Sequence, residues 1–257
     1  MTLRETLKKI SVLKWTVIFF RALRRKHSVI KIIRELFEFS QDWHAYKKLT
    51  PNSSFALKAQ DLYPRLFDKT TTTAIDPVYF YQNSWCAKKI FENKPIQHVD
   101  VGSDAKFIGI ISQYAPTTMV DIRPLPVALS GLSFVEGSIL ALPFKDNEVS
   151  SLSSICVIEH IGLGRYGDPL DQFGSEKAAK ELSRVLAPNG SLYISAPIDD
   201  ENRVYFNAHR AFTRAYILEL FGTLKNVEEK YIYGNKIYDA YDHTKGFGTG
   251  LYHFSKE

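Results

Sequence analysis

Strand-like apolar runs alternate with helical segments from residue 96 to the end of the chain. The helical stretch "DAKFIGIISQYA" separates the runs "IQHVDVG" and "TTMVDI", and the helical stretch "SEKAAKELSRVLA" separates "EVSSLSSICVI" from "GSLYISAP". This alternation predicts a mostly parallel sheet, because neighbouring parallel strands need a crossover connection, usually a helix. A sheet of this kind binds its ligand at the carboxyl ends of its strands.

The loop after the first strand, "VDVGSDAKF", carries one glycine, Gly102, where a dinucleotide fingerprint has three. Asp100 and Asp104 flank this glycine, and two carboxylates repel a pyrophosphate at a helix N-terminus. S-adenosylmethionine carries a sulfonium and an ammonium group and no phosphate. The loop therefore favours S-adenosylmethionine over NAD or FAD.

Two further strand ends are expected beside this loop. Asp121 ends the second strand, 19 residues after Gly102, which is about the spacing at which an acidic side chain reaches a ribose hydroxyl. Ser138 follows the third strand, where a hydroxyl and neighbouring amides can meet an adenine edge. Asp121 could also be an ordinary strand-end turn residue, and Ser138 an ordinary loop serine.

Residues 96–222 resemble a class I S-adenosylmethionine-dependent methyltransferase. Four stretches carry the resemblance, in the family's order and spacing: "HVDVGSD", "MVDI", "EGSILALPFKDNEVSSLSSICVIEHI" and "ELSRVLAPNGSLYISAP". The stretches "YFYQNSWCAKKI", "EHIGLGRYGDPLDQFGSEKAAKEL" and "NAHRAFT" are similar to a bacterial methyltransferase-like family of unassigned function, the domain of unknown function 268 type. Members of that family are associated with surface-glycan assembly.

The resemblance implies an α/β, Rossmann-like class I methyltransferase fold. We expect a seven-stranded mixed sheet with helices on both faces, in which "GTGLYHFSK" forms the last, antiparallel strand. In the implied site Gly102 approaches the methionyl part, Asp121 accepts from the ribose, and Ser138 and Ile139 meet the adenine. The whole expected cofactor-binding set is Asp100, Gly102, Asp104, Asp121, Ser138, Ile139, Glu159, Tyr81 and Gln82. Tyr81 and Gln82 belong to it only if "VYFYQNSW" is a lid rather than core.

The methyl-acceptor side should be built from residues 162–171 and 199–213, which follow the fourth and fifth strands. A hydroxyl acceptor needs a general base, and a histidine pKa suits neutral pH. His209 is the first catalytic candidate and His160 the second, although His209 and Arg210 could instead cap the next helix. Expected substrate contacts are Arg165, Tyr166, Asp168, Asn207 and Arg210. We expect no metal, because the consecutive acids 199–201 are typical of a solvated loop.

The first fifty residues differ from the rest in charge. They hold twelve of the 33 Lys and Arg and four of the 28 Asp and Glu, a net charge of +8 against −3 in the remaining chain. The apolar stretch 10–23 is too short to span a bilayer, and 29–39 has amphipathic helical spacing. We expect residues 1–45 to bind an anionic membrane surface, with packing on the catalytic domain or on a partner as the alternative. Nucleic acid is not an expected partner.

The expected domains are a basic amphipathic helical extension (1–50), a helical lead-in (51–95) and a methyltransferase-like domain (96–257). The two cysteines lack metal-ligand spacing and suggest a reducing cytoplasm, so we expect a cytoplasmic protein at the inner membrane face. The expected function is S-adenosylmethionine-dependent O-methylation of a small-molecule or lipid-linked sugar or glycan acceptor. The alternatives are a non-catalytic scaffold with this fold in a glycan-assembly complex, and an NAD-dependent oxidoreductase.

Overall fold

The structure is a computed structural model, and it describes residues 28–50 and 52–257. The chain divides into two compact units, with the boundary between Ala74 and Ile75. This boundary falls inside the segment that we expected to be a single lead-in. The predicted helical stretch 10–23 lies outside the described residues.

In its described residues, the N-terminal unit contains a long helix, α2 (Val29–Lys47), and a short 3-10 turn, η1 (Ala59–Asp61). Ser28 caps α2, because its hydroxyl accepts a hydrogen bond from the backbone N–H of Lys31 at 3.2 Å. No helix within the described residues is long and apolar enough to cross a membrane.

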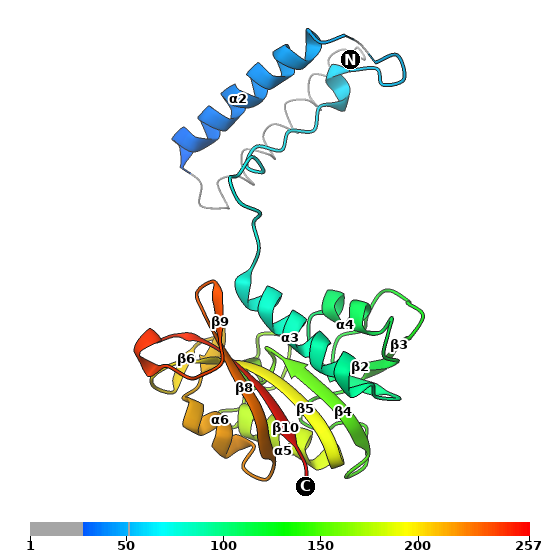
Figure 1. The fold of residues 1–257 in the computed structure, drawn as a ribbon, viewed down its shortest axis with the longest axis vertical. Helices are drawn as coiled ribbons and strands as arrows, with labels where there is room; N and C mark the ends of the chain where they lie inside the picture. The colour runs from blue at the N-terminus through cyan, green and yellow to red at the C-terminus, as the bar shows by residue number, and fades with distance from the viewer. Residues whose placement is uncertain (1–27, 51) are drawn as a thin grey trace. The chain divides into compact units, whose positions relative to one another are not determined.

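The second unit is built on an eight-stranded sheet (Figure 1), with strand order β3-β2-β1-β4-β5-β10-β8-β9. The first five strands in this order run parallel, whereas β10 is antiparallel to both β5 and β8. The strands are β1 (His98–Val101), β2 (Thr117–Asp121), β3 (Leu132–Glu136), β4 (Val149–Ile155), β5 (Leu186–Ile198), β8 (Lys225–Tyr233), β9 (Lys236–Tyr238) and β10 (Gly248–Ser255). The Rossmann-like mixed sheet and its antiparallel last strand are therefore confirmed.

The expected strand number, seven, is wrong by one. The extra strand, β9, pairs antiparallel with the end of β8 across the two residues Gly234 and Asn235. Gly234 has a φ of +58°, which a two-residue hairpin turn requires and glycine adopts without strain. The "YGNK" stretch therefore makes a hairpin that adds one strand to the sheet edge.

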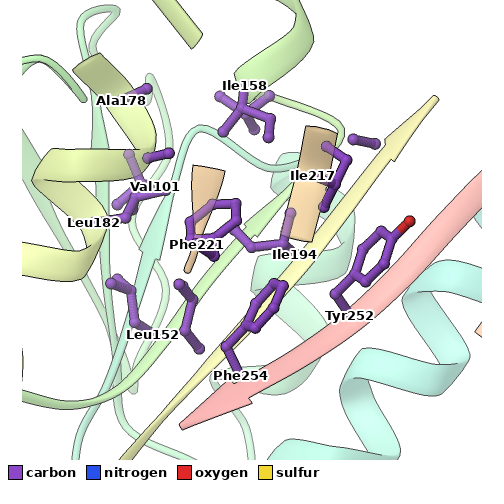
Figure 2. Packing of buried hydrophobic residues seen from close by; sticks show 14 of the residues in the cluster. Val101, Leu152, Ile158, Ala178, Leu182, Ile194, Ile217, Phe221, Tyr252 and Phe254 are labelled. Carbon is purple, nitrogen blue, oxygen red and sulfur yellow. The ribbon is translucent and has the colours of Figure 1, made fainter. Parts of the chain in front are cut away.

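Helices cover both faces of the sheet, and each face has its own apolar core. Side chains of α5 (Gly174–Val185) and α6 (Arg214–Leu220) pack with Leu192, Ile194 and Phe254 on one face (Figure 2). Side chains of α3 (Pro77–Asn93) and α4 (Ala105–Ile111) pack with Tyr193 and Leu251 on the other. Neighbouring strand residues thus alternate between the two cores, as the pleat of a sheet requires.

Helix α3 is anchored at its start and along its length. The Asp76 carboxylate accepts hydrogen bonds from the N–H groups of Val78 and Tyr79, and Pro77 occupies the first turn. Further along, the Trp85 indole N–H donates to Glu228 of β8 at 2.9 Å. This helix therefore belongs to the sheet-bearing unit and brings its first turn to the edge of the site.

The segment after β5 forms a small hairpin instead of an open loop. Strands β6 (Arg203–Tyr205) and β7 (His209–Ala211) pair antiparallel and make a separate two-stranded sheet. Helix α6 is capped by Thr213, whose hydroxyl accepts from the N–H of Tyr216, so His209 and Arg210 do not cap it. The remaining short elements are the 3-10 turns η2 (Ile158–His160) and η3 (His243–Lys245).

Candidate active site

A cavity of about 430 Å³ lies where the carboxyl ends of β1, β2, β3 and β4 meet. Half of the sixteen residues expected at the site line this cavity: Gly102, Asp104, Asp121, Ser138, Ile139, His160, Tyr166 and Asp168. The other half lie outside its lining: Asp100, Glu159, Tyr81, Gln82, Arg165, Asn207, His209 and Arg210.

Gly102 lets the chain turn sharply at the end of β1. Its φ is +74°, and a Cβ atom built on it would come within 3.1 Å of the Val157 side chain. Both the backbone conformation and this close approach favour glycine at the position. The wall of the cavity is therefore bare backbone here, which lets a ligand come close to the chain.

The two acidic residues of this loop have different surroundings. Asp100 is fully buried and accepts hydrogen bonds from the Ser103 N–H at 3.0 Å, the Ser103 hydroxyl at 2.6 Å and the Ser153 hydroxyl at 2.5 Å. Burial raises the pKa of Asp100 to about 6. Asp104 lines the cavity and caps α4, accepting from the N–H groups of Lys106 and Phe107. Asp100 thus shapes the loop, and Asp104 faces the ligand space.

Asp121 ends β2 with its carboxylate held by Arg123. The guanidinium donates to the two carboxylate oxygens at 3.1 Å each, and the Arg123 N–H donates to Oδ1 at 2.8 Å. Only Oδ2 keeps acceptor capacity for a ligand hydroxyl while this pair is intact. The Arg123 side chain is 55% exposed, so it can move aside at small cost.

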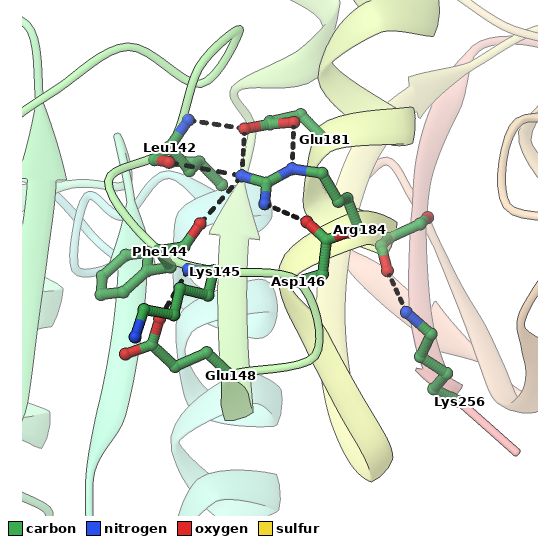
Figure 3. Close-up of polar contacts among 9 residues, drawn as sticks. Leu142, Phe144, Lys145, Asp146, Glu148, Glu181, Arg184 and Lys256 are labelled. Atoms are coloured by element: carbon green, nitrogen blue, oxygen red, sulfur yellow. Dashed lines mark hydrogen bonds and ion pairs between the residues drawn. The ribbon is translucent and has the colours of Figure 1, made fainter.

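The loop after β3 is fixed by charged residues of α5 (Figure 3). The Glu181 carboxylate accepts from the Leu142 N–H at 2.7 Å, and the Arg184 guanidinium donates to the Phe144 carbonyl at 3.0 Å and to Asp146 at 2.6 Å. These bonds tie residues 142–146, in the loop that also carries Ser138 and Ile139, to α5. The Ser138 hydroxyl accepts from the Leu140 N–H at 3.2 Å, so it also stabilises its own turn.

The chain after β4 places an acid and a histidine side by side. Glu159 is 1% exposed, and burial raises the pKa of its carboxyl to about 8. His160 lines the cavity, and its Nδ1 lies 2.7 Å from the Ala208 carbonyl oxygen. A carbonyl can only accept, so Nδ1 carries the proton and Nε2 carries the lone pair. Burial lowers the pKa of His160 to about 4, so the ring is neutral near pH 7.

Residues 162–171 form one wall of the cavity mouth. The Asp168 carboxylate accepts from the Gly162 N–H at 2.6 Å, which ties the loop into a closed turn. The Tyr166 ring lies against two guanidinium groups, 4.6 Å from Arg123 and 4.9 Å from Arg165. Arg165 in turn donates to the Ala208 carbonyl at 2.8 Å. Tyr166 therefore links the β2 end of the cavity to the β6–β7 hairpin.

The β6–β7 hairpin supports the loops around the cavity, and its expected site residues do not line the cavity itself. Arg210 is 8% exposed and donates to three backbone carbonyls, those of Ile161, Asp171 and Gln172, and to the Ser175 hydroxyl. These bonds occupy its guanidinium, which we expected to bind substrate.

The other two residues expected from this hairpin also lie off the cavity. The His209 ring lies beside Tyr205, with ring centres 5.1 Å apart, and Phe247, at 6.0 Å. Asn207 is exposed in the hairpin turn. The structure therefore gathers His160, and not His209, with the other lining residues.

Helix α3 presents a different residue to the cavity from the two expected. Tyr79 lines it, whereas the Tyr81 hydroxyl donates to the Asn235 carbonyl in the β8–β9 turn at 3.1 Å. Gln82 is fully buried, and its Oε1 accepts from the Cys156 thiol at 3.0 Å and the Ser195 hydroxyl at 2.9 Å. Tyr79 precedes Tyr81 by two residues and Gln82 by three. Its position in the first helical turn after the Asp76 cap is the sequence signal that could have indicated it.

Arg123 and Cys156 also line the cavity and were not expected there. Arg123 follows Asp121 by two residues, and that spacing is the signal that could have indicated it. Cys156 has a φ of +54°, which nothing in an apolar strand sequence indicates. Within the described parts of the chain no group of three or more His, Cys, Asp or Glu side chains is placed to hold a metal ion.

Residues 143–230 match the family model described as "Caenorhabditis protein of unknown function, DUF268". The chain has the class I methyltransferase fold, and its residues 143–230 are similar to this family. The expected resemblance, to a methyltransferase-like family of unassigned function, is thereby confirmed. No curated protein matches this sequence.

Solved structures of the same fold share few residues with this chain. The N-methyltransferase NodS from Bradyrhizobium japonicum is 16% identical, with 71% of this chain and 98% of that chain covered and a TM-score of 0.54. The 1,6-didemethyltoxoflavin-N1-methyltransferase from Burkholderia thailandensis, with bound S-adenosylhomocysteine, is 12% identical over 90% and 91%, with a TM-score of 0.52. The [4+2]-cyclase SpnF is also similar, 12% identical over 68% and 80%, with a TM-score of 0.53.

Proposed function

We propose that this protein is an S-adenosylmethionine-dependent methyltransferase. The observation that carries the proposal is one cavity at which Gly102, Asp121 and Ile139, from three adjacent strand ends, meet. Two of the similar solved structures are methyltransferases by name, and one of them holds S-adenosylhomocysteine. The cyclase shares the fold but is named for a different reaction, so the fold alone does not determine the chemistry of the site.

The residues present fit this cofactor in three respects. Bare backbone at Gly102 allows the methionyl part to come close. Asp121 keeps an acceptor position on Oδ2 for a ribose hydroxyl, and the Ile139 backbone lies where an adenine edge is expected. Asp104 and Asp168 add negative charge to the lining, which suits a sulfonium and an ammonium group.

A dinucleotide fits less well. Its pyrophosphate would need the helix N-terminus that the Asp104 carboxylate already caps. The nicotinamide-dependent alternative therefore lacks an anion site at the position where this fold provides one.

The bound cofactor supplies an electrophilic methyl group, and the protein must supply a base if the acceptor is a hydroxyl. His160 is the residue in place to do this. Its ring lines the cavity, Nδ1–H is held by the Ala208 carbonyl, and the neutral Nε2 can take the hydroxyl proton. His209 lies outside the lining and is assigned no role in proton transfer.

The acceptor that we propose is a sugar or a glycan-related hydroxyl compound. Support comes from the association of the similar family with surface glycans and from two tyrosines, Tyr79 and Tyr166, that line the cavity. An aromatic ring can cover the C–H face of a sugar while polar groups meet its hydroxyls. The alternative of a non-catalytic scaffold predicts that the same cavity supports no methyl turnover.

We also propose that residues 1–45, which include most of α2, bring the protein to an anionic membrane surface. In α2, Ile30, Ile33 and Phe37, at helical spacings of three and four, are 81%, 59% and 63% exposed. The three basic residues of α2 are balanced by three acidic ones, and residues 1–27 hold seven of the eight net positive charges of the first fifty residues. An exposed apolar stripe beside basic residues suits the interface of a membrane that contains acidic lipids.

Methyl transfer is tested with methyl-tritiated S-adenosylmethionine and pools of free sugars, nucleotide sugars and lipid-linked sugars. Label should move to at least one pool, and His160→Gln should slow the transfer at least about 100-fold. His209→Gln is the matched control and should keep most of the activity. Absence of transfer to every pool, with cofactor bound, would favour the scaffold.

Membrane binding is tested by flotation of the full chain with phosphatidylglycerol vesicles at low and high salt. Binding should fall as salt rises, because screening weakens the attraction between lysines and acidic lipids. A double variant, Ile33→Glu with Phe37→Glu, should float poorly. The control Val227→Glu changes an apolar residue of β8 that is 51% exposed, and it should float as the wild type does.

A further inference from the structure

Glu159 is a buried acid that forms no ion pair with a lysine or arginine among the described residues. Glu159 is 1% exposed, and its Oε2 has no hydrogen-bond partner among the described residues. The nearest charged or titratable groups are His160 on its own turn, the Cys156 thiol, Arg165 from the loop after η2 and Tyr79 from α3. Burial outweighs the attraction to Arg165, so the carboxyl holds its proton at neutral pH.

The partner nearest to this acid is the proposed base. His160 Nε2 lies 3.7 Å from Glu159 Oε1, while Nδ1–H is fixed by the Ala208 carbonyl. The orientation of the ring therefore leaves only Nε2 to take a proton, and it does so beside Glu159. With a neutral Glu159, an imidazolium formed there has no counter-charge, and burial also opposes it.

The cavity next to Glu159 and His160 can favour the ionised form of Glu159. Cys156 and His160, which flank Glu159, both belong to the cavity lining. A positive charge in the cavity therefore stands close to the acid in a medium that water screens poorly. Such a charge stabilises the carboxylate form of Glu159 over the protonated form.

We infer that Glu159 loses its proton to solvent when a cationic ligand occupies the cavity, and that the resulting carboxylate prepares His160 to act as a base. This inference rests on the proposed function, which makes the ligand S-adenosylmethionine. Only the carboxyl O–H bond breaks, its electron pair stays on the carboxylate, and the proton goes to buffer. Glu159 is thus a positioning residue, which acts through His160 and does not touch the acceptor.

The order of events follows from the charges. Before ligand binding the pair is neutral and stable in its buried position. After binding, a carboxylate faces a neutral imidazole, and transfer of the acceptor proton to Nε2 then forms an ion pair instead of an isolated cation. The base is therefore weak in the free protein and becomes effective only with the cationic ligand in place.

The test is calorimetric titration of S-adenosylmethionine into the full-length protein near neutral pH, in phosphate and in Tris buffer. The difference between the two apparent enthalpies gives the number of protons released. We expect about 0.5 to 1 proton per ligand bound for S-adenosylmethionine, and fewer for S-adenosylhomocysteine, which lacks the sulfonium charge. Glu159→Gln should abolish most of the release while still binding, and the surface control Glu219→Gln should not change it.

A second measurement needs no variant. Release by the wild type should disappear above about pH 9, where Glu159 is already ionised before the ligand binds. Binding without any buffer dependence overturns the inference and leaves the proposed function intact. Release that persists in Glu159→Gln also overturns it, because the proton then comes from another group. Absence of binding altogether refutes the proposed function itself.

Discussion

Replacing the buried acid by its neutral isostere should make the protein more stable at high pH. In the folded protein the pKa of Glu159 is raised from 4.5 to about 8. A raised carboxyl pKa means that the stabilising, protonated form is fully present below about pH 4.5 and is lost as the pH rises through about 8. The glutamine of Glu159→Gln cannot ionise, so the free energy of unfolding of this variant does not fall with pH for this reason.

The size of the effect follows from the two pKa values. Between pH 4.5 and about pH 8, the free energy of unfolding of the wild type falls by about 1.4 kcal/mol per pH unit relative to that of the variant. From about pH 5.5 to about pH 8.5, the free energy of unfolding of Glu159→Gln should therefore rise by about 3 kcal/mol relative to that of the wild type. Comparing the two ends of the range removes any constant effect of the amide on packing.

Urea unfolding of both proteins, followed by circular dichroism at several pH values, measures this difference. The urea dependence of the unfolding free energy should be equal in the two proteins, so that only the midpoints move. A stability difference that stays constant within about 0.5 kcal/mol over the range would refute the reasoning. It would mean that Glu159 is ionised in the free protein, and the proton-release inference would fail with it.

Three other substitutions test separate parts of the site. Gly102→Ala should weaken S-adenosylmethionine binding at least tenfold in calorimetry, because a φ of +74° and a Cβ 3.1 Å from Val157 distort the loop. Arg210→Ala should lower the free energy of unfolding by about 2 to 4 kcal/mol in urea, since the part-buried carbonyls of Ile161, Asp171 and Gln172 lose the donor that ties them together. Arg123→Ala should bind the same ligand up to about threefold more tightly, because Asp121 no longer shares its carboxylate. Unchanged binding by Gly102→Ala would contradict the first expectation, and unchanged stability of Arg210→Ala the second. Clearly weaker binding by Arg123→Ala would contradict the third.

The parts of the fold that the sequence predicts are those with strong periodicity. The strand–helix alternation and the antiparallel last strand come from apolar patterns that continue over several residues, and such patterns depend little on distant contacts. Strand β9 is only three residues long, and its existence depends on a turn at Gly234 rather than on a pattern. Short elements of this kind are decided by turn chemistry and are easily missed.

The site was predictable to a different degree on its two sides. Gly102, Asp121 and Ile139 are placed by strand ends, which the sequence marks, and all three line the cavity. The acceptor side is placed by tertiary contacts. His209 and Arg210 looked available in a loop, but they lie in a β-hairpin whose Arg210 binds backbone carbonyls far along the chain.

The same reasoning explains why Glu159 needed the structure. The family resemblance implies a cofactor-binding role for Glu159, but nothing in the sequence indicates that its side chain is buried and lies outside the cavity lining. Its significance comes from complete burial, a missing partner for Oε2 and the 3.7 Å distance from Oε1 to His160 Nε2. None of these three facts can be deduced from the neighbouring letters.

Calorimetric titration of the wild type and of Asp121→Ala decides whether the ends of β1, β2 and β3 bind S-adenosylmethionine. We expect binding in the micromolar range for S-adenosylmethionine and S-adenosylhomocysteine, at least tenfold weaker binding by Asp121→Ala, and no comparable binding of NAD. Binding that Asp121→Ala leaves unchanged would place the cofactor elsewhere. No binding up to millimolar concentrations would contradict the claim and favour the scaffold.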